Sequence, residues 1–406
     1  MSKESFFKRY GPGIFLIGAN IGTGSVSTMS TVGAYFGLKL IWAIVLSCLF
    51  TWVMVTVIGR VSCYNTTSIL IQFKNHFGSW ALILVGFAIA FTQFFSTMGV
   101  IGVVSEATGE LLEINKLYPA AFWGLLIFLA IYFGNYGRFE SILKWLVAIF
   151  GISFIITLFI VLFKQGFNFL DLSQGIPKGE FSGWATAACV GTTFSSGILI
   201  MRSYLILDKG WTKIDLKKES VDALISVIGM AILSIAVVMC ATAALYHSDI
   251  LKNIAPIDFT SIQMAENLRP LAGEYTVLLF TIGIIGAGLS SALPNALVSI
   301  WCISDIFKLE RNCKRPYFRI LGAIWAFSGV LGILTGRPVP ITVMAQALIL
   351  LVTPLISILS GYIAFKDGLL GKKGTISYYV MIILCVAAIL FSLSMSLIGF
   401  KKVFFI

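Results

Sequence analysis

The sequence predicts an all-α polytopic membrane protein with about eleven transmembrane helices. Three observations support this prediction: 58% of the 406 residues are hydrophobic, only 12% are charged, and the mean hydropathy is +0.96. Soluble domains usually contain about 25% charged residues, so a water-soluble globular protein is excluded. Since a span needs about 20 apolar residues, little sequence is left for a domain outside the bilayer.

Eleven apolar runs are long enough to cross a bilayer. They lie at about 12–37, 40–59, 80–112, 118–134, 141–164, 183–207, 219–247, 274–307, 317–335, 339–364 and 376–399. We expect residues 1–164 (spans 1 to 5) to form one repeat and residues 183–364 (spans 6 to 10) a second, with the extra span 376–399 left over. Because each repeat has an odd number of helices, the second copy is expected in inverted orientation.

The net charge of +11 lies mainly in short loops between the apolar runs. This distribution is typical of a membrane topology signal, and we expect no nucleic-acid partner. Most Lys and Arg residues fall on one side of the bilayer when the N-terminus is placed in the cytoplasm. We therefore expect an integral plasma-membrane protein with a cytoplasmic N-terminus and an external C-terminus. The seven cysteines include no CxxC pair, so neither a disulfide framework nor a zinc site is expected.

The first and sixth spans contain polar interruptions that an ordinary transmembrane helix lacks. In the first span the interruption is IGTGSVSTMS, and in the sixth it is VGTTFSSG. A helix break in hydrocarbon frees backbone N–H and C=O groups, each of which costs several kcal/mol, on the order of 2–7, unless it finds a partner. Interrupted spans at matching places in two inverted halves indicate a transporter's central binding site. The alternative is that these small residues only allow close helix packing.

Several segments resemble the Nramp family of divalent-metal transporters. They include GPGIFLIGANIGTGS in the first span, SEATGELLEI in the third, FTIGIIGAGLSSALPNAL in the eighth and AQALILLVTPLISI in the tenth. The resemblance covers nearly the whole chain. It implies a LeuT-like fold with eleven spans, inverted five-helix repeats, and a substrate site between the unwound parts of spans 1 and 6.

The metal-binding motifs of that family are missing from this sequence. Its Asp-Pro-Gly-Asn motif is replaced by Gly22, Thr23, Gly24 and Ser25, and its sixth-span motif with Met and His is replaced by Thr192, Ser195, Ser196, Gly197 and Ile198. A family His one turn further along is replaced by Arg202. Glu106 matches the family's third-span Glu, and Gln346 matches a tenth-span Gln near the metal. We therefore expect no metal ligands and no thioether at this site.

The replacement residues favour an anion over a cation. Transition metals bind imidazole, sulfur and carboxylate ligands, and Mg²⁺ or Ca²⁺ sites usually include a carboxylate. Half-helix N-termini instead present N–H donors and a positive dipole end, and Arg202 would add five donors. Other readings of these residues remain open. Arg202 could snorkel to the interface or pair with Glu106, Glu106 could be a structural partner or a proton relay, and the hydroxyls could cap broken helix ends.

The sequence thus predicts a secondary active transporter of a small inorganic solute, by preference an oxyanion such as bicarbonate. The alternatives are a divalent-cation transporter for Mn²⁺ or Mg²⁺ and a non-transporting membrane receptor. Enzymatic activity is not expected, since no catalytic constellation is visible. We expect no cofactor, a coupling ion that is H⁺ or Na⁺, and a monomer in the lipid bilayer. The predicted substrate-binding residues are Gly22, Thr23, Gly24, Ser25, Thr192, Ser195, Ser196, Gly197 and Gln346, and the predicted coupling or gating residues are Glu106 and Arg202.

Overall fold

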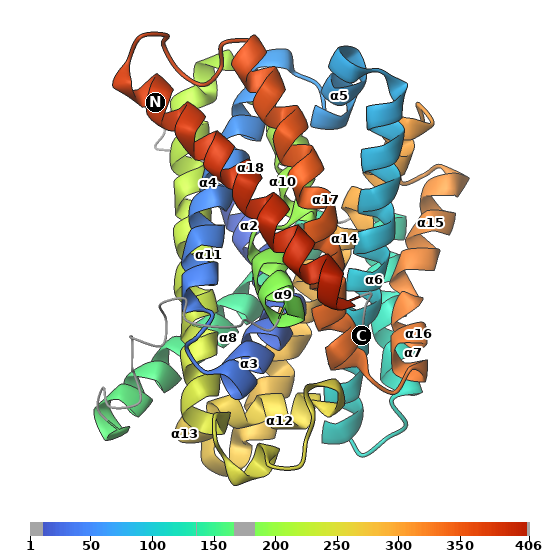
Figure 1. Ribbon diagram of the computed structural model, residues 1–406. Coiled ribbons are helices and arrows are strands. Elements are labelled where there is room, and N and C mark those ends of the chain that lie inside the picture. The colour runs from blue at the N-terminus through green and yellow to red at the C-terminus, as the bar shows by residue number, and fades with distance from the viewer. Residues whose placement is uncertain (1–10, 135, 166–182, 404–406) are drawn as a thin grey trace, which may run out of the picture.

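The computed structural model describes residues 11–134, 136–165 and 183–403, and these residues form a bundle of helices without a strand (Figure 1). The long helices are α2 Gly11–Asn20, α3 Thr23–Phe36, α4 Ile41–Asn65, α5 Ile69–Phe77, α6 Ser79–Leu111, α7 Leu117–Phe133, α8 Tyr136–Gln165, α9 Gly183–Thr193, α10 Ser196–Asp208, α11 Leu216–Leu245, α14 Thr276–Ile306, α15 Pro316–Ala326, α17 Pro338–Lys366 and α18 Ile376–Val403. The short helices are α12 Ser261–Ala265, α13 Arg269–Ala272 and α16 Ser328–Leu334.

These helices agree with the predicted spans. In the described part of the chain, eight helices are long and apolar enough to cross a membrane by length and composition. Two shorter apolar helices are Leu117–Phe133 and Ala148–Phe163. The first expected span is the pair α2 and α3. The predicted breaks are confirmed: α2 ends at Asn20 before α3 begins at Thr23, and α9 ends at Thr193 before α10 begins at Ser196. The division into two repeats stays a prediction, and its residues 1–10 lie outside the described part.

Helical structure outside the predicted spans lies in the connections. Hydropathy did not predict α5, whose N-cap Ser68 accepts a hydrogen bond from the N–H of Ile71, nor the short helices α12 and α13 between α11 and α14. The predicted ninth span is divided into α15 and α16 around Phe327. Short polar helices have no long apolar run, so hydropathy does not reveal them.

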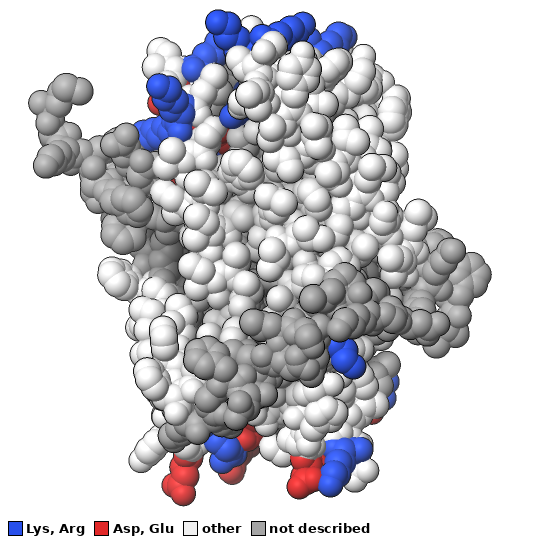
Figure 2. All heavy atoms as spheres, turned by 60° about the vertical axis from the view of Figure 1, so that its left-hand side comes forward, with Lys and Arg blue, Asp and Glu red and all other residues white. Residues whose placement is uncertain are grey.

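The surface of the bundle matches a protein surrounded by lipid. Figure 2 shows a broad uncharged band between two charged ends. Large apolar side chains such as Trp145, Phe163 and Leu390 point outward and are exposed, as expected where hydrocarbon replaces water. The end where α10, α14 and α17 finish is rich in Lys and Arg, whereas the opposite end carries both signs of charge (Figure 2). The placement of the basic end in the cytoplasm remains a prediction.

The broken helices lie in the centre of the bundle, between α6, α14 and α17. Nearly all side chains of α3, α9 and the first half of α10 are buried. Close packing here depends on glycine. A Cβ on Gly191 of α9 would lie 2.0 Å from the backbone oxygen of Gln346 on α17. Because the contact is with backbone, a larger residue at this position would push the two helices apart.

We expect Gly191→Ala to lower the free energy of unfolding by about 1–3 kcal/mol, the usual cost of overpacking a close contact. The measurement is the midpoint of thermal unfolding of the purified protein in detergent. Gly361→Ala is the matched control, since Gly361 is also helical but its Cβ would lie 3.6 Å from the nearest atom, an ordinary contact. Equal midpoints for the two variants would contradict the packing described here.

Candidate functional site

The two helix breaks place two half-helix N-termini beside one another in the centre of the protein. Gly22 precedes α3 and Ser195 precedes α10, and both residues have extended backbone. At neither N-terminus does a side chain form a capping hydrogen bond. The first N–H groups of a helix have no partner within the helix, so these two ends can donate to a bound group.

The carbonyl ends of the same breaks are covered by hydroxyl groups. Ser25 Oγ donates to the backbone oxygen of Asn20 at 2.5 Å, where α2 ends. After α9 ends, Thr353 Oγ1 donates to the Phe194 oxygen at 3.1 Å. Thr51 Oγ1 lies 3.0 Å from the Thr193 oxygen, but it lies closer, at 2.7 Å, to the Ser47 oxygen of its own helix. The free carbonyl groups of both breaks are therefore partly neutralised by protein donors, while the N-termini are not.

A bridge of hydroxyl groups joins the two breaks to each other. Ser25 Oγ of α3 lies 2.9 Å from Thr192 Oγ1 of α9. Two other predicted site residues serve a different purpose: Thr23 Oγ1 donates to the Ile284 oxygen of α14 at 3.4 Å, and Ser196 Oγ donates to the Ile349 oxygen of α17 at 2.9 Å. Their hydroxyl groups hold the broken spans against neighbouring helices.

A cavity of about 30 Å³ lies between the breaks. A water molecule needs about 10–15 Å³ by this measure, so the cavity accommodates only a few atoms in this conformation. Its lining includes seven of the predicted substrate residues, namely Gly22, Gly24, Ser25, Thr192, Ser195, Gly197 and Gln346. Thr23, Ser196, Glu106 and Arg202 are not part of the lining.

Further polar residues line the cavity that the predicted set did not contain. They are Asn20 at the end of α2, Gln93 and Ser96 on α6, and Ser291 and Asn295 on α14. Gln93 and Ser96 are polar residues one turn apart in an otherwise apolar span, which is the signal that could have identified them. Met201 of α10 also lines the cavity. The motif position itself lacks a thioether, because Ser195 occupies it, but the cavity does contain the thioether of Met201, six residues further along the chain.

No side chain that lines the cavity is ionisable. Within the described ranges, no group of three or more His, Cys, Asp or Glu residues is arranged to hold a metal ion. The electrostatic character of the site therefore depends on backbone dipoles and neutral amide and hydroxyl groups.

Arg202 does not serve as a donor to substrate. Its side chain is 0% exposed, and its guanidinium contacts Asp222 Oδ2 at 2.5 Å and Glu219 Oε1 at 3.0 Å. Asp222 also accepts a hydrogen bond from the N–H of Gly13 at 2.9 Å, which ties the start of α2 to α11. The expectations that Arg202 snorkels, pairs with Glu106 or binds an anion are wrong, since α11 supplies two carboxylates one turn apart that occupy it.

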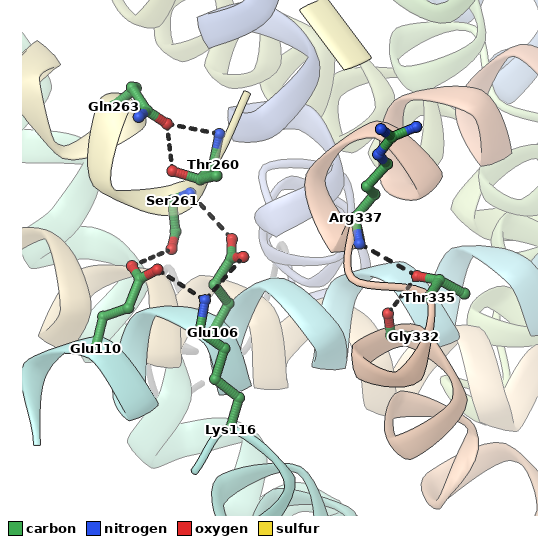
Figure 3. A network of polar contacts seen from close by, with 9 residues as sticks. All are labelled: Glu106, Glu110, Lys116, Thr260, Ser261, Gln263, Gly332, Thr335 and Arg337. Atoms are coloured by element: carbon green, nitrogen blue, oxygen red, sulfur yellow. Dashed lines mark hydrogen bonds and ion pairs between the residues drawn. The ribbon is translucent and has the colours of Figure 1, made fainter. Parts of the chain in front are cut away.

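Glu106 belongs to a second ionic cluster at the other end of the cavity-forming helices (Figure 3). Its carboxylate accepts from the N–H of Ser261 at 3.0 Å and lies 3.3 Å from Lys116 Nζ. Lys116 Nζ also lies 2.9 Å from Glu110, which in turn accepts from Ser261 Oγ at 3.0 Å. The cluster thus fastens α12, in the connection between α11 and α14, to the end of α6.

Lys116 stays charged within this cluster. Partial burial lowers the pKa of Lys116, but the hydrogen bond to Glu110 and the charge of Glu106 outweigh it, and the pKa is raised overall. The ammonium group therefore remains positive at neutral pH and stays paired with both Glu106 and Glu110.

We expect Arg202→Met to lower the free energy of unfolding by about 3–5 kcal/mol, because it leaves two buried carboxylates without their counter-charge. Adding Glu219→Gln and Asp222→Asn to the same chain should recover much of that loss. The matched control is Arg337→Met, which removes an exposed pair with Asp258 and should cost less than about 1 kcal/mol. Equilibrium unfolding in detergent measures all three, and a fully stable Arg202→Met variant would refute the role assigned to this cluster.

Solved structures show which fold this arrangement shares. A manganese transporter from Eremococcus coleocola, in complex with an aromatic bis-isothiourea compound, aligns with a TM-score of 0.71 and 14% sequence identity over 99% of this chain and 96% of that chain. Mhp1, in its inward-facing conformation, aligns with a TM-score of 0.63 and 13% identity over 97% and 90%. MhsT in complex with L-phenylalanine aligns with a TM-score of 0.63 and 15% identity over 98% and 100%.

The sequence itself matches one protein family over most of its length. Residues 13–399 match the family described as natural resistance-associated macrophage protein-like, or Nramp. A comparison with curated proteins finds no sequence match. The structural matches confirm the LeuT-like fold, and members of this family are transporters, not enzymes. The chain therefore belongs to the Nramp family and is an integral membrane protein that acts as a secondary transporter.

Proposed function

We propose that this transporter carries a small oxyanion, such as bicarbonate. The observation that carries the proposal is the pairing of two uncapped half-helix N-termini with a cavity whose lining contains no ionisable side chain. Each helix N-terminus has the effect of about half a positive charge. Anions bind at such ends through backbone N–H groups.

The balance between the positive and negative helix ends favours an anion. Four half-helix ends meet at the breaks, and a site with all four equally exposed would have no preferred sign. Hydroxyl groups of Ser25 and Thr353 donate to the Asn20 and Phe194 carbonyl oxygens, whereas the N-cap residues of α3 and α10 form no side-chain capping hydrogen bond. The N–H groups at these two N-termini are thus available as donors, which supports a substrate rich in acceptor oxygens.

Transport of a divalent cation is the second candidate function. It is supported by the family, by the structural match to a manganese transporter, and by the thioether of Met201 in the lining. Amide oxygens of Asn20, Asn295 and Gln346 would then bind a largely hydrated ion. Against this candidate, a carboxylate usually contributes to Mg²⁺ sites and imidazole or thiolate to transition-metal sites, and the lining has none of these groups.

The two ionic clusters lie where alternating access requires closure. In transporters of this type the repeats rock around a central site. Arg202 and Asp222 tie the start of α2 at one end, and Glu106 ties α12 at the other. We assign both clusters to gating, since breaking either one would free an element packed against the broken spans or the helices that enclose them. Either H⁺ or Na⁺ remains our proposal for the coupling ion.

The test is uptake into liposomes that contain the purified protein. We expect uptake of ¹⁴C-bicarbonate that depends on an H⁺ or Na⁺ gradient and no uptake of ⁵⁴Mn²⁺. Uptake of Mn²⁺ without bicarbonate would establish the second candidate, and uptake of neither would favour a non-transporting receptor.

A carboxylate returned to the site provides a further test. We expect Ser25→Asp to reduce bicarbonate uptake by at least about 10-fold, because a buried negative charge would repel the anion at short range. Asn312→Asp, which adds the same charge in an exposed loop, is the matched control and should retain normal uptake. An unaltered rate for Ser25→Asp would show that the anion does not bind at the breaks.

A further inference from the structure

Gln93 presents a hydrogen-bond donor to the cavity. Its side chain is 2% exposed, it belongs to the cavity lining, and its Nε2 has no hydrogen-bond partner among the described residues. Gly197 at the start of α10 makes room for it, since a Cβ on Gly197 would lie 2.3 Å from Gln93 Nε2. A buried donor without a partner costs about 1–3 kcal/mol, and a bound acceptor would remove that cost.

Ser96, one turn further along α6, provides a second donor. Its Oγ accepts hydrogen bonds from Asn295 Nδ2 at 3.2 Å and from Gln346 Nε2 at 3.4 Å. A hydroxyl oxygen has two acceptor positions and one hydrogen. Both acceptor positions are occupied, so the hydrogen of Ser96 remains for a group in the cavity. Ser195 adds a third hydroxyl, for which the described part of the chain supplies no hydrogen-bond partner.

The opposite side of the cavity presents acceptors. Ser25 has given its hydrogen to the Asn20 backbone oxygen, so Thr192 must donate the hydrogen bond between Ser25 and Thr192. Thr192 Oγ1 therefore faces the cavity with lone pairs only. Asn20 Nδ2 donates to Met230 Sδ at 2.8 Å. Asn20 Oδ1 lies 3.5 Å from Ser25 Oγ, whose hydrogen is donated to the Asn20 backbone oxygen, so Oδ1 can still accept a hydrogen bond.

We propose that this division of the cavity selects oxyanions that still carry a proton. The donors of Gln93, Ser96 and Ser195 would bind the unprotonated oxygens, and Thr192 and Asn20 would accept the substrate O–H. The inference rests on the proposed function and narrows it to hydrogen oxyanions such as bicarbonate. Nitrate has the same charge and a similar planar shape, but it has no hydrogen to offer the acceptor side.

A site built to bind a hydroxyl group rejects an analogue without it, because a buried acceptor is left unpaired. The first experiment measures competition of unlabelled bicarbonate, nitrate and formate against ¹⁴C-bicarbonate uptake by the intact protein in liposomes. We expect nitrate and formate to compete at least about 10-fold more weakly than bicarbonate. Equal competition by nitrate would overturn the inference and leave the oxyanion proposal standing. Absence of any bicarbonate or nitrate uptake would overturn both.

Two variants separate the acceptor side from the donor side. Thr192→Val keeps the shape of the side chain but removes its oxygen, so it should weaken bicarbonate binding about 10-fold and leave nitrate binding unchanged. Thr192→Ser keeps the oxygen and should retain the wild-type ratio of bicarbonate to nitrate affinity. Gln93→Met removes a donor and should weaken the binding of bicarbonate and of nitrate by similar factors. If Thr192→Val weakened the binding of both anions equally, the proposed division into a donor side and an acceptor side would be wrong. Should that variant fail to fold, the competition in the unaltered protein decides the question.

Discussion

Backbone hydrogen bonding in a medium without water is the constraint on which this structure depends. Two spans stop and restart in the centre of the bundle, and each interruption exposes N–H and C=O groups that lipid cannot satisfy. The protein places both interruptions side by side and encloses them with α6, α14 and α17. Side-chain hydroxyls serve the carbonyl groups, and a small cavity remains at the amino ends. The central cavity is thus a consequence of how the backbone groups at the breaks find hydrogen-bond partners.

In the described part of the chain, the ionic clusters of Arg202 and Glu106 lie toward opposite ends of the cavity-forming helices. Arg202 has two carboxylate partners from α11, and Glu106 has an ammonium partner and a backbone donor. An unpaired buried ion would be costly, so each cluster contains charges of both signs in contact with one another. This arrangement leaves the central cavity neutral, where the weak fields of helix dipoles have their greatest influence.

Membership of the Nramp family indicates the fold, whereas the residues at the breaks determine the chemistry of the cavity. The family match covers residues 13–399, and the fold agrees with that of a manganese transporter at 14% identity. The fold positions the breaks, but the residues within them set the chemistry. Here Gly22 to Ser25 and Thr192 to Gly197 form the two breaks and contain no carboxylate.

The sequence by itself determined the spans, the two breaks and the family, since hydropathy and helix interruption are properties of consecutive residues. Seven of the nine predicted substrate residues line the cavity, and six of these seven lie at the two breaks that the sequence reveals. Only the tertiary structure decided the partners of polar side chains. Arg202 pairs with Glu219 and Asp222 across an interface between helices, and Gln93 reaches the cavity because Gly197 leaves room for it. Such partners lie far apart along the chain, so they follow from packing and not from local pattern.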